Sequence, residues 1–290
     1  MRKHAVNAIG VIGAGVVGRA LIKGMLDARS VSRSGIWAVT RSGASADHAA
    51  RETGVTVHAG LREARASIGR AETILLCVKP KDVAAVAREL RELGLPPNAL
   101  VISTAAGVAL ATLEKALGDV AVVRAMPNTP CVVREGITTI CGGTRAGVAH
   151  IKRTRAIFES VGRCMELQEI HFDAVTGLGG SGPAYMYLVM EALADGGVRV
   201  GLPRDVAMEL VVQVARGAAE MVRQTGRHPA HLRDDVTTPA GCTIAALLVL
   251  EDGKIRSVLA RAVEEATRVA RGLGGKDSVT VDPPVPTPPK

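Results

Sequence analysis

The sequence predicts an α/β protein, with a doubly wound parallel sheet in the first half of the chain and an all-helical second half. Short runs rich in Val and Ile alternate with helix-like stretches up to about residue 168, and this alternation is typical of parallel strands joined by helices. From Asp173 onward, apolar residues recur at helical spacing with no strand pattern between them. A chain of 290 residues is also long enough for two domains.

The strand-like runs of the first half are residues 8–12, 36–40, 55–57, 73–78, 100–103 and 120–123. Apolar spacing predicts helices over residues 16–28, 81–93 and 110–117, and a helix over 148–160 with further strands at 137–141 and 164–167. In the second half, helices are expected over residues 185–195, 204–224, 240–250 and 255–271. Residues 276–290 are rich in proline and predict a flexible, extended tail.

The composition favours a small anionic ligand over nucleic acid or a membrane. There are 36 Lys and Arg residues against 28 Asp and Glu residues, but the basic residues are scattered rather than clustered. Aromatic residues make up only 2% of the chain and leave few rings for stacking on bases. No segment reaches the roughly 18 apolar residues of a membrane span. We therefore expect neither a nucleic-acid nor a membrane partner.

The five cysteines predict reduced thiols in a cytoplasmic protein. They stand far apart, in an odd number, with no CxxC pair and no histidine at metal-ligand spacing. We therefore expect no metal site. Cys242 lies beside Thr243, but no base that would activate its thiol is visible in the sequence, so a packed thiol is favoured over a nucleophile.

A glycine-rich loop predicts a dinucleotide site. The pattern GxGxxG over residues 13–18 follows a strand-like run and opens a helix-like one, and this context makes an otherwise common pattern specific. A backbone without side chains lets a pyrophosphate approach the helix N-terminus, where free N–H groups attract anions. The expected cofactor contacts of this loop are Ile12, Gly13, Ala14, Gly15, Val16, Val17 and Gly18.

The end of the second predicted strand favours NADPH over NADH. An NAD site usually has an acidic residue about 20 positions after the glycines, where it binds the ribose 2′-hydroxyl. Here the strand is followed by Arg41 and Ser42, which suit a 2′-phosphate. The alternative is an ordinary loop arginine in a basic chain, and NADH use stays open.

Three further segments follow predicted strands at the same edge of the sheet. Ligands of open α/β sheets lie beyond the carboxyl ends of the strands, so these segments are expected to wall the cofactor site. Pro80 alone is equally consistent with a plain strand terminator, and Asn128 offers an amide for a ring carboxamide. The residues concerned are Cys77, Val78, Lys79, Pro80, Thr104, Ala105, Ala106 and Asn128.

Two segments of the helical half have the composition of ligand-binding turns. Residues 177–182 hold four glycines before a helix, which indicates close approach of the backbone to a ligand or to another helix. Thr238 before Pro239 has the form of a helix N-cap with proline at the first helical position. The same helix start, with hydroxyls at Thr238 and Thr243, is also suited to bind a carboxylate.

These motifs together resemble the pyrroline-5-carboxylate reductase family, in order and over nearly the whole chain except the tail. The segment 173–185 and the Thr-Pro-x-Gly-x-Thr turn over residues 238–243 are the most specific matches. The resemblance implies a Rossmann-type NADP-binding domain over residues 1–168, and a helical dimerisation and substrate domain over 169–275. It also implies homodimers, often assembled into larger rings, and a substrate set of Ser181, Thr238, Gly241, Cys242 and Thr243.

Three positions depart from the pattern of that family. Ala240 stands where a glycine is usual, Leu61 where an asparagine usually contacts the adenine-side ribose, and Asp235 where an asparagine is often found. We expect these departures to change cofactor affinity and the preference between NADPH and NADH, and to leave the reaction intact.

The reaction implied by the resemblance is hydride transfer from NAD(P)H to the C=N carbon of 1-pyrroline-5-carboxylate, which yields L-proline. Thr243, or a water that it holds, is the expected donor to the ring nitrogen. Two alternatives stay open: a related NADP-dependent reductase of another cyclic imine, and an NADP-binding protein without catalysis. A β-hydroxyacid reductase is disfavoured, because its catalytic lysine has no counterpart between Lys152 and Lys254.

Overall fold

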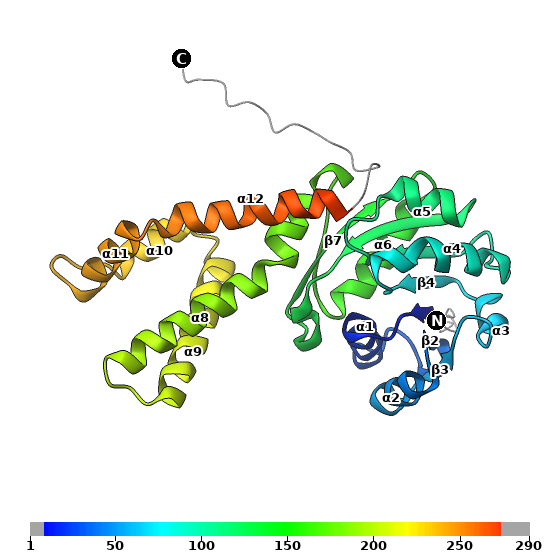
Figure 1. Cartoon of the computed structure of the whole chain (residues 1–290), viewed down its shortest axis with the longest axis horizontal. Helices are drawn as coiled ribbons and strands as arrows, with labels where there is room; N and C mark the ends of the chain where they lie inside the picture. Colours follow the sequence, from blue (N-terminus) through cyan, green and yellow to red (C-terminus); the bar gives the residue numbers. More distant parts are fainter. Residues whose placement is uncertain (1–8, 274–290) are drawn as a thin grey trace, which may run out of the picture. The chain divides into compact units, whose positions relative to one another are not determined.

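The computed structural model describes residues 9–273, which form two compact units (Figure 1). The first unit contains the described residues up to Gly180 together with those from Ala266 onward, and the second contains Ser181–Glu265. The tail predicted over residues 276–290 lies outside the described residues.

The first unit is built on one eight-stranded sheet with the order β3-β2-β1-β4-β5-β6-β7-β8. Neighbouring strands are parallel except for β6 and β7, which pair antiparallel. The doubly wound α/β fold is therefore confirmed. The strands are β1 (Ile9–Ile12), β2 (Ile36–Thr40), β3 (Thr56–Ala59), β4 (Thr73–Leu76), β5 (Leu100–Ser103), β6 (Ala121–Met126), β7 (Gly136–Gly142) and β8 (Gly162–Glu166).

Alternate residues of the central strands face two separate hydrophobic cores. In β2, Ile36 and Ala38 belong to one core, whereas Trp37 and Val39 belong to the other. Since side chains of a strand point to opposite faces in turn, a strand covered by helices on both sides is apolar throughout. Every residue of β1, β4 and β5 is accordingly buried.

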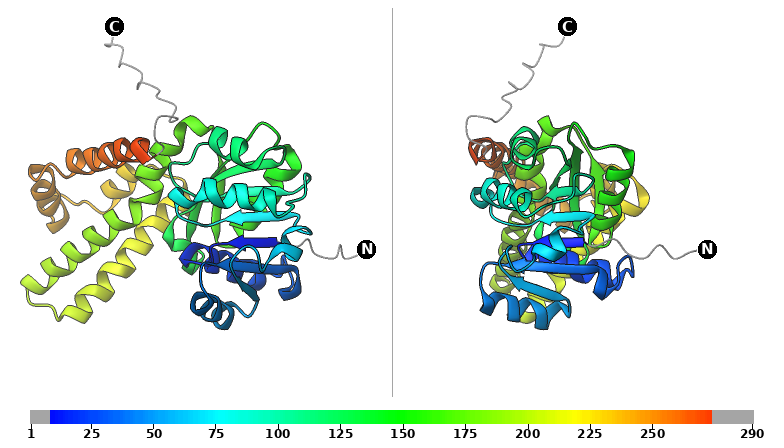
Figure 2. Two further views of the ribbon diagram at one scale, coloured as in Figure 1. Left: turned by 45° about the vertical axis from the view of Figure 1, so that its right-hand side comes forward. Right: turned by 90° about the vertical axis from the view of Figure 1, so that its right-hand side faces the viewer.

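Helices cover both faces of this sheet (Figure 2). Residues of α1 (Val16–Asp27), α2 (Gly43–Thr53) and α6 (Val148–Glu159) belong to the first core. Residues of α3 (Arg65–Ile68), α4 (Val83–Glu92) and α5 (Leu110–Leu117) belong to the second. Helix α2 was not expected, because its sequence is mostly polar and it buries only Ala46, Ala49 and Thr53.

The glycine-rich segment before the helical half is helical, which corrects the expected turn. Phe172–Val175 form the short helix α7, and Thr176–Gly180 continue as a π-helix into α8 (Gly182–Arg199). The Thr176 hydroxyl donates to the Phe172 carbonyl oxygen at 2.8 Å, as expected within a helix. Glycine lowers the stability of a helix but does not prevent one from forming. The conformation of this segment therefore depends on its contacts with the rest of the protein.

Helices alone form the second unit, as expected. Helices α8 and α9 (Arg204–Thr225) contact each other closely through small residues: Ala194 and Ala207 are buried, and a Cβ on Gly197 would lie 3.1 Å from that of Ala207. The remaining helices are α10 (Pro229–Asp235), α11 (Cys242–Asp252) and α12 (Ile255–Leu273), the last of which extends into residues grouped with the first unit. Helix α10 was not expected, since seven residues are too few for an apolar period.

No helix within residues 9–273 combines the length and apolar character that crossing a bilayer requires. The same residues hold no group of three or more His, Cys, Asp and Glu side chains placed to bind a metal ion.

Candidate functional site

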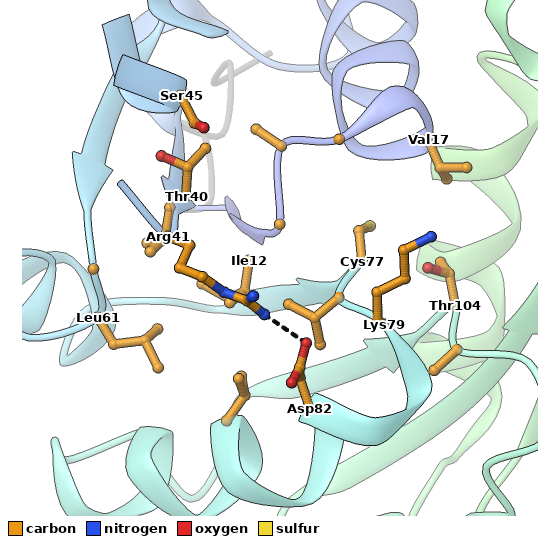
Figure 3. Close-up of a pocket in the computed structure, with 18 of the residues that line it drawn as sticks. Ile12, Val17, Thr40, Arg41, Ser45, Leu61, Cys77, Lys79, Asp82 and Thr104 are labelled. Carbon is orange, nitrogen blue, oxygen red and sulfur yellow. Dashed lines mark hydrogen bonds and ion pairs between the residues drawn. The ribbon is translucent and has the colours of Figure 1, made fainter. Parts of the chain in front are cut away.

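A cavity of about 1310 Å³ lies in the first unit, beyond the carboxyl ends of strands β1 to β5 (Figure 3). It brings together all the expected cofactor residues except Gly18, Ser42 and Asn128. Parallel strands end at the same edge of a sheet, so loops distant in sequence converge there. The predicted residues that line the cavity are Ile12, Gly13, Ala14, Gly15, Val16, Val17, Arg41, Cys77, Val78, Lys79, Pro80, Thr104, Ala105 and Ala106.

The three glycines of the loop have different roles. Gly13 adopts a φ of +99°, and a Cβ there would lie 2.7 Å from the Cys77 carbonyl oxygen. A Cβ on Gly18 would lie 2.3 Å from the Gly13 carbonyl oxygen, so this glycine lets helix α1 pack on the loop and does not line the cavity. Gly15 is the N-cap of α1 and has open space where its side chain would be. The N–H groups at this helix start are therefore open to an anionic ligand.

Backbone hydrogen bonds hold the segments that follow β4 and β5, which form one side of the cavity. The Cys77 amide donates to the Ile12 carbonyl oxygen at 2.8 Å, and the Thr104 amide donates to the Leu76 carbonyl oxygen at 2.9 Å. Desolvation raises the pKa of the Cys77 thiol to about 12. The thiol is therefore neutral at physiological pH, and it is a packing group rather than a nucleophile.

Four charged side chains and one histidine that the sequence did not single out also line the cavity. They follow β3 and β4 or lie on α1, α2 and α4, where neither spacing nor a motif singled them out. Within residues 9–273, Arg62 and Lys79 form no ion pair, and Arg41 is paired only with Asp82 at 2.7 Å. The excess of basic groups favours an anionic ligand. The missed residues are Arg19, His48, Arg62, Asp82 and Glu89.

Ser42 and Asn128 make contacts within the protein instead of lining the cavity. The Ser42 hydroxyl oxygen caps helix α2 by accepting from the Ser45 amide at 3.4 Å. The Asn128 side chain donates to the Gly179 carbonyl oxygen at 3.1 Å and accepts from the Ile137 amide at 2.9 Å. Asn128 thus joins three separate segments of the first unit.

All five expected substrate residues lie in the second unit. The expectation that Thr238 caps the following helix is wrong. Thr238 is not the N-cap of α11, because the Gly241 amide donates to the Thr238 carbonyl oxygen at 3.0 Å and closes a turn. The helix begins at Cys242 with Gly241 as its N-cap, and no side chain caps it. The N–H groups of its first turn, including that of Thr243, therefore lack a side-chain acceptor. Ser181 occupies the N-cap position of α8.

Leu61 and Asp235, two of the three departures from the family pattern, have different surroundings in the structure. Leu61 lines the cavity with an apolar side chain that is 7% exposed, so it is largely packed against the protein. Asp235, at the end of α10, accepts from the Arg227 guanidinium at 2.6 Å. This hydrogen bond is the main cause of a lowered pKa of Asp235.

The third departure, Ala240, strains the turn. Its φ is +55°, in the left-handed region that favours glycine. We expect Ala240→Gly to raise the free energy of unfolding by about 0.5–1 kcal/mol. Glycine removes the backbone strain of the folded state, and this gain exceeds the loss of stability caused by the greater conformational entropy of the unfolded chain. The measurement is urea unfolding. Ala245→Gly, within helix α11, should lower the stability instead; a loss in both variants would contradict the strain.

Both units are similar to known proteins. Residues 169–273 match the family model described as pyrroline-5-carboxylate reductase dimerisation, and residues 8–107 match that described as NADP oxidoreductase coenzyme F420-dependent. A pyrroline-5-carboxylate reductase of Synechocystis is 40% identical, over 92% of this chain and 98% of its own length.

Solved structures agree with this similarity. The pyrroline-5-carboxylate reductase of Coxiella burnetii is 32% identical with a TM-score of 0.85, over 93% of this chain and 100% of that one. The NADP-bound pyrroline carboxylate reductase of Plasmodium falciparum is 28% identical with a TM-score of 0.83, over 93% and 99%. Because the similarity spans the cavity and the helical unit alike, the chain belongs to the pyrroline-5-carboxylate reductase family.

Proposed function

We propose that this protein reduces the C=N bond of 1-pyrroline-5-carboxylate to give L-proline with NAD(P)H, the last step of proline biosynthesis. The observation that carries this proposal is a similarity of 40% identity over 92% of the chain, which includes both the cavity and the turn before α11. The nicotinamide cofactor supplies the hydride, so the protein has to bind and orient the two reactants.

Within this proposal, residues 1–168 bind the dinucleotide and residues 169–275 bind the substrate and form the dimer. The open space at Gly15 takes the pyrophosphate, and Arg41 faces the 2′-phosphate of NADPH. NADH, which lacks that phosphate, is the weaker cofactor. The uncapped N–H groups at the start of α11 hold the substrate carboxylate, and the Thr243 hydroxyl donates to the ring nitrogen. Ser181, Thr238, Gly241 and Cys242 complete the substrate site.

The assay that tests the function is loss of NADPH absorbance after addition of pyrroline-5-carboxylate. Piperideine carboxylates serve as controls for a reductase of another cyclic imine. Turnover should be fastest with pyrroline-5-carboxylate. A preference for a control substrate would favour the alternative reductase, and binding of NADPH without turnover of any imine would favour a protein without catalysis.

Thr243 provides the test of the catalytic assignment. Thr243→Val keeps the shape of the side chain and removes its hydroxyl, so kcat/KM should fall by about one to two decades, or about 1.5–3 kcal/mol. Thr243→Ser should retain most activity, and NADPH affinity should barely change in either variant. If Val lowers only the melting temperature and leaves kcat/KM unchanged, Thr243 merely stabilises the helix start.

We further propose a homodimer formed by the second unit, with dimers assembled into a larger ring. Apolar side chains of α8, α9 and α11 stay uncovered in the single chain; Leu188, Val214 and Val249 are 67%, 66% and 71% exposed. Burial of such a surface is favourable. Light scattering at micromolar concentration should give a dimer or a multiple of it, whereas a 30.1 kDa species alone would contradict the assignment. The reduced thiols expected from the sequence also support a cytoplasmic location.

A further inference from the structure

An ion pair spans the cavity between the loops that follow β2 and β4. Arg41 follows β2, and Asp82 ends the short 3-10 turn Pro80–Asp82 that follows β4. Strand β1 lies between these two strands in the sheet, so the pair crosses above the carboxyl end of β1, where the glycine loop begins. Figure 3 shows the two side chains reaching toward each other, with Nη2 of Arg41 2.7 Å from Oδ2 of Asp82.

Neither side chain of this pair has another polar partner within the described residues. Asp82 is the N-cap residue of α4, yet its carboxylate makes no capping hydrogen bond, although aspartate at this position commonly does. The side chain of Arg41 remains 82% exposed despite the pair, whereas that of Asp82 is 28% exposed. The guanidinium is therefore accessible to a ligand, and the carboxylate faces the cavity beside it.

We propose that Asp82 sets the preference between NADPH and NADH by competing with the 2′-phosphate for Arg41. This inference rests on the proposed function of the cavity as a dinucleotide site. A 2′-phosphate that approaches Arg41 meets the negative charge of Asp82, either displacing the carboxylate or remaining close to it. Displacement costs the attraction between Asp82 and Arg41, and a carboxylate that stays close repels the phosphate, so both outcomes weaken binding. NADH has a hydroxyl in place of the phosphate and leaves the pair intact.

Asp82 thus lowers the advantage of NADPH that Arg41 alone would confer. An aspartate at this position reduces the difference in affinity between NADPH and NADH, because it weakens binding only of the cofactor that carries the additional phosphate charge. Arg62 and Lys79 also line the cavity, and neither forms an ion pair with another described residue. Their charges favour both cofactors, because both carry the same pyrophosphate.

The test is a fluorescence titration of NADPH and NADH, without substrate, on the full chain and on Asp82→Asn. Removal of the charge should lower the Kd for NADPH about 3- to 10-fold, given the strength of exposed ion pairs and the added repulsion. The Kd for NADH should change less than about 2-fold. The melting temperature should stay within about 2 °C, because an exposed ion pair contributes little to stability.

Three variants make the result specific to the pair. Arg41→Ala should weaken NADPH binding more than NADH binding, and adding Asp82→Asn to it should produce a much smaller gain than in the wild-type background. Glu92→Gln removes a charge from the same helix outside the cavity and should affect neither Kd. Higher salt should reduce the difference between wild type and Asp82→Asn.

Each contrary outcome has a distinct meaning. A higher Kd for NADPH in Asp82→Asn overturns the proposal, because Asp82 would then hold Arg41 in place for the phosphate. Equal changes for NADPH and NADH also overturn it. Binding of neither nucleotide to the wild type overturns both this inference and the cofactor assignment, whereas the expected binding without imine reduction overturns only the proposed reaction.

Discussion

Gly15→Val should weaken NADPH binding about 100-fold or more and leave the fold intact. A Cβ on Gly15 would have no heavy atom within 4 Å apart from its neighbours in the chain, so the protein itself leaves room for a side chain to start there. In the complex it would occupy the space of the pyrophosphate and separate the phosphate from the N–H groups of α1. The loss of two charge-assisted hydrogen bonds corresponds to about 3–6 kcal/mol, or at least two decades in Kd. Fluorescence titration measures this loss.

Gly43→Val is the matched control for this prediction. Gly43 also has open space around its missing side chain and starts helix α2, but it does not line the cavity. Its substitution should leave NADPH affinity near that of the wild type, and both variants should keep cooperative thermal unfolding. NADPH binding by Gly15→Val with unchanged affinity would show that the loop does not hold the pyrophosphate.

Arg124→Ala should lower the free energy of unfolding by about 3 kcal/mol, through loss of a buried ion pair. Nη1 of Arg124 lies 2.9 Å from Oε1 of Glu169, and the two side chains are 7% and 24% exposed. The same Glu169 oxygen accepts from the Leu110 amide at 2.7 Å. The Arg124 guanidinium also lies over the Phe172 ring, 4.7 Å from its centroid. These contacts join β6 to the start of α5 and to the segment before the π-helix.

Urea unfolding monitored by circular dichroism measures this loss, with Arg145→Ala as the control. Arg145 pairs with Asp119 at the surface, where both side chains are mostly exposed, so its removal should cost less than about 1 kcal/mol. Equal losses in the two variants would mean that the buried pair contributes no more than a surface pair. Glu169→Gln should be milder than Arg124→Ala, since the amide still accepts from Leu110 and Arg124.

Sequence reasoning worked where the signal is local. The strands at 36–40 and 100–103 and the helix at 110–117 were predicted with the bounds that the structure has. An apolar run between turn residues, or apolar spacing over two helical turns, is set by neighbours in the chain. The glycine loop was recognised for the same reason, because the strand, the turn and the helix start are contiguous. Most of the expected cofactor residues consequently line one cavity.

Local patterns failed where other segments decide the conformation. Helix α2 has few apolar residues, and its stability depends on three small buried side chains. The Thr-Pro sequence at 238–239 is a frequent start of a helix, yet here it forms a turn that places Ala240 at a positive φ. Such choices depend on packing against residues distant in sequence, which an isolated window does not contain.

By itself, the sequence determined the alternating sheet, the glycine-rich loop between a strand and a helix, and the helical second half, because each is encoded by residues adjacent in the chain. Only the tertiary structure revealed that a Cβ has room at Gly15 but none at Gly18. It alone brought Arg41 to Asp82 and Arg124 to Glu169, across 41 and 45 positions of sequence. The order of strands in the sheet decides which loops meet, and an ion pair between two loops exists only after that order is set.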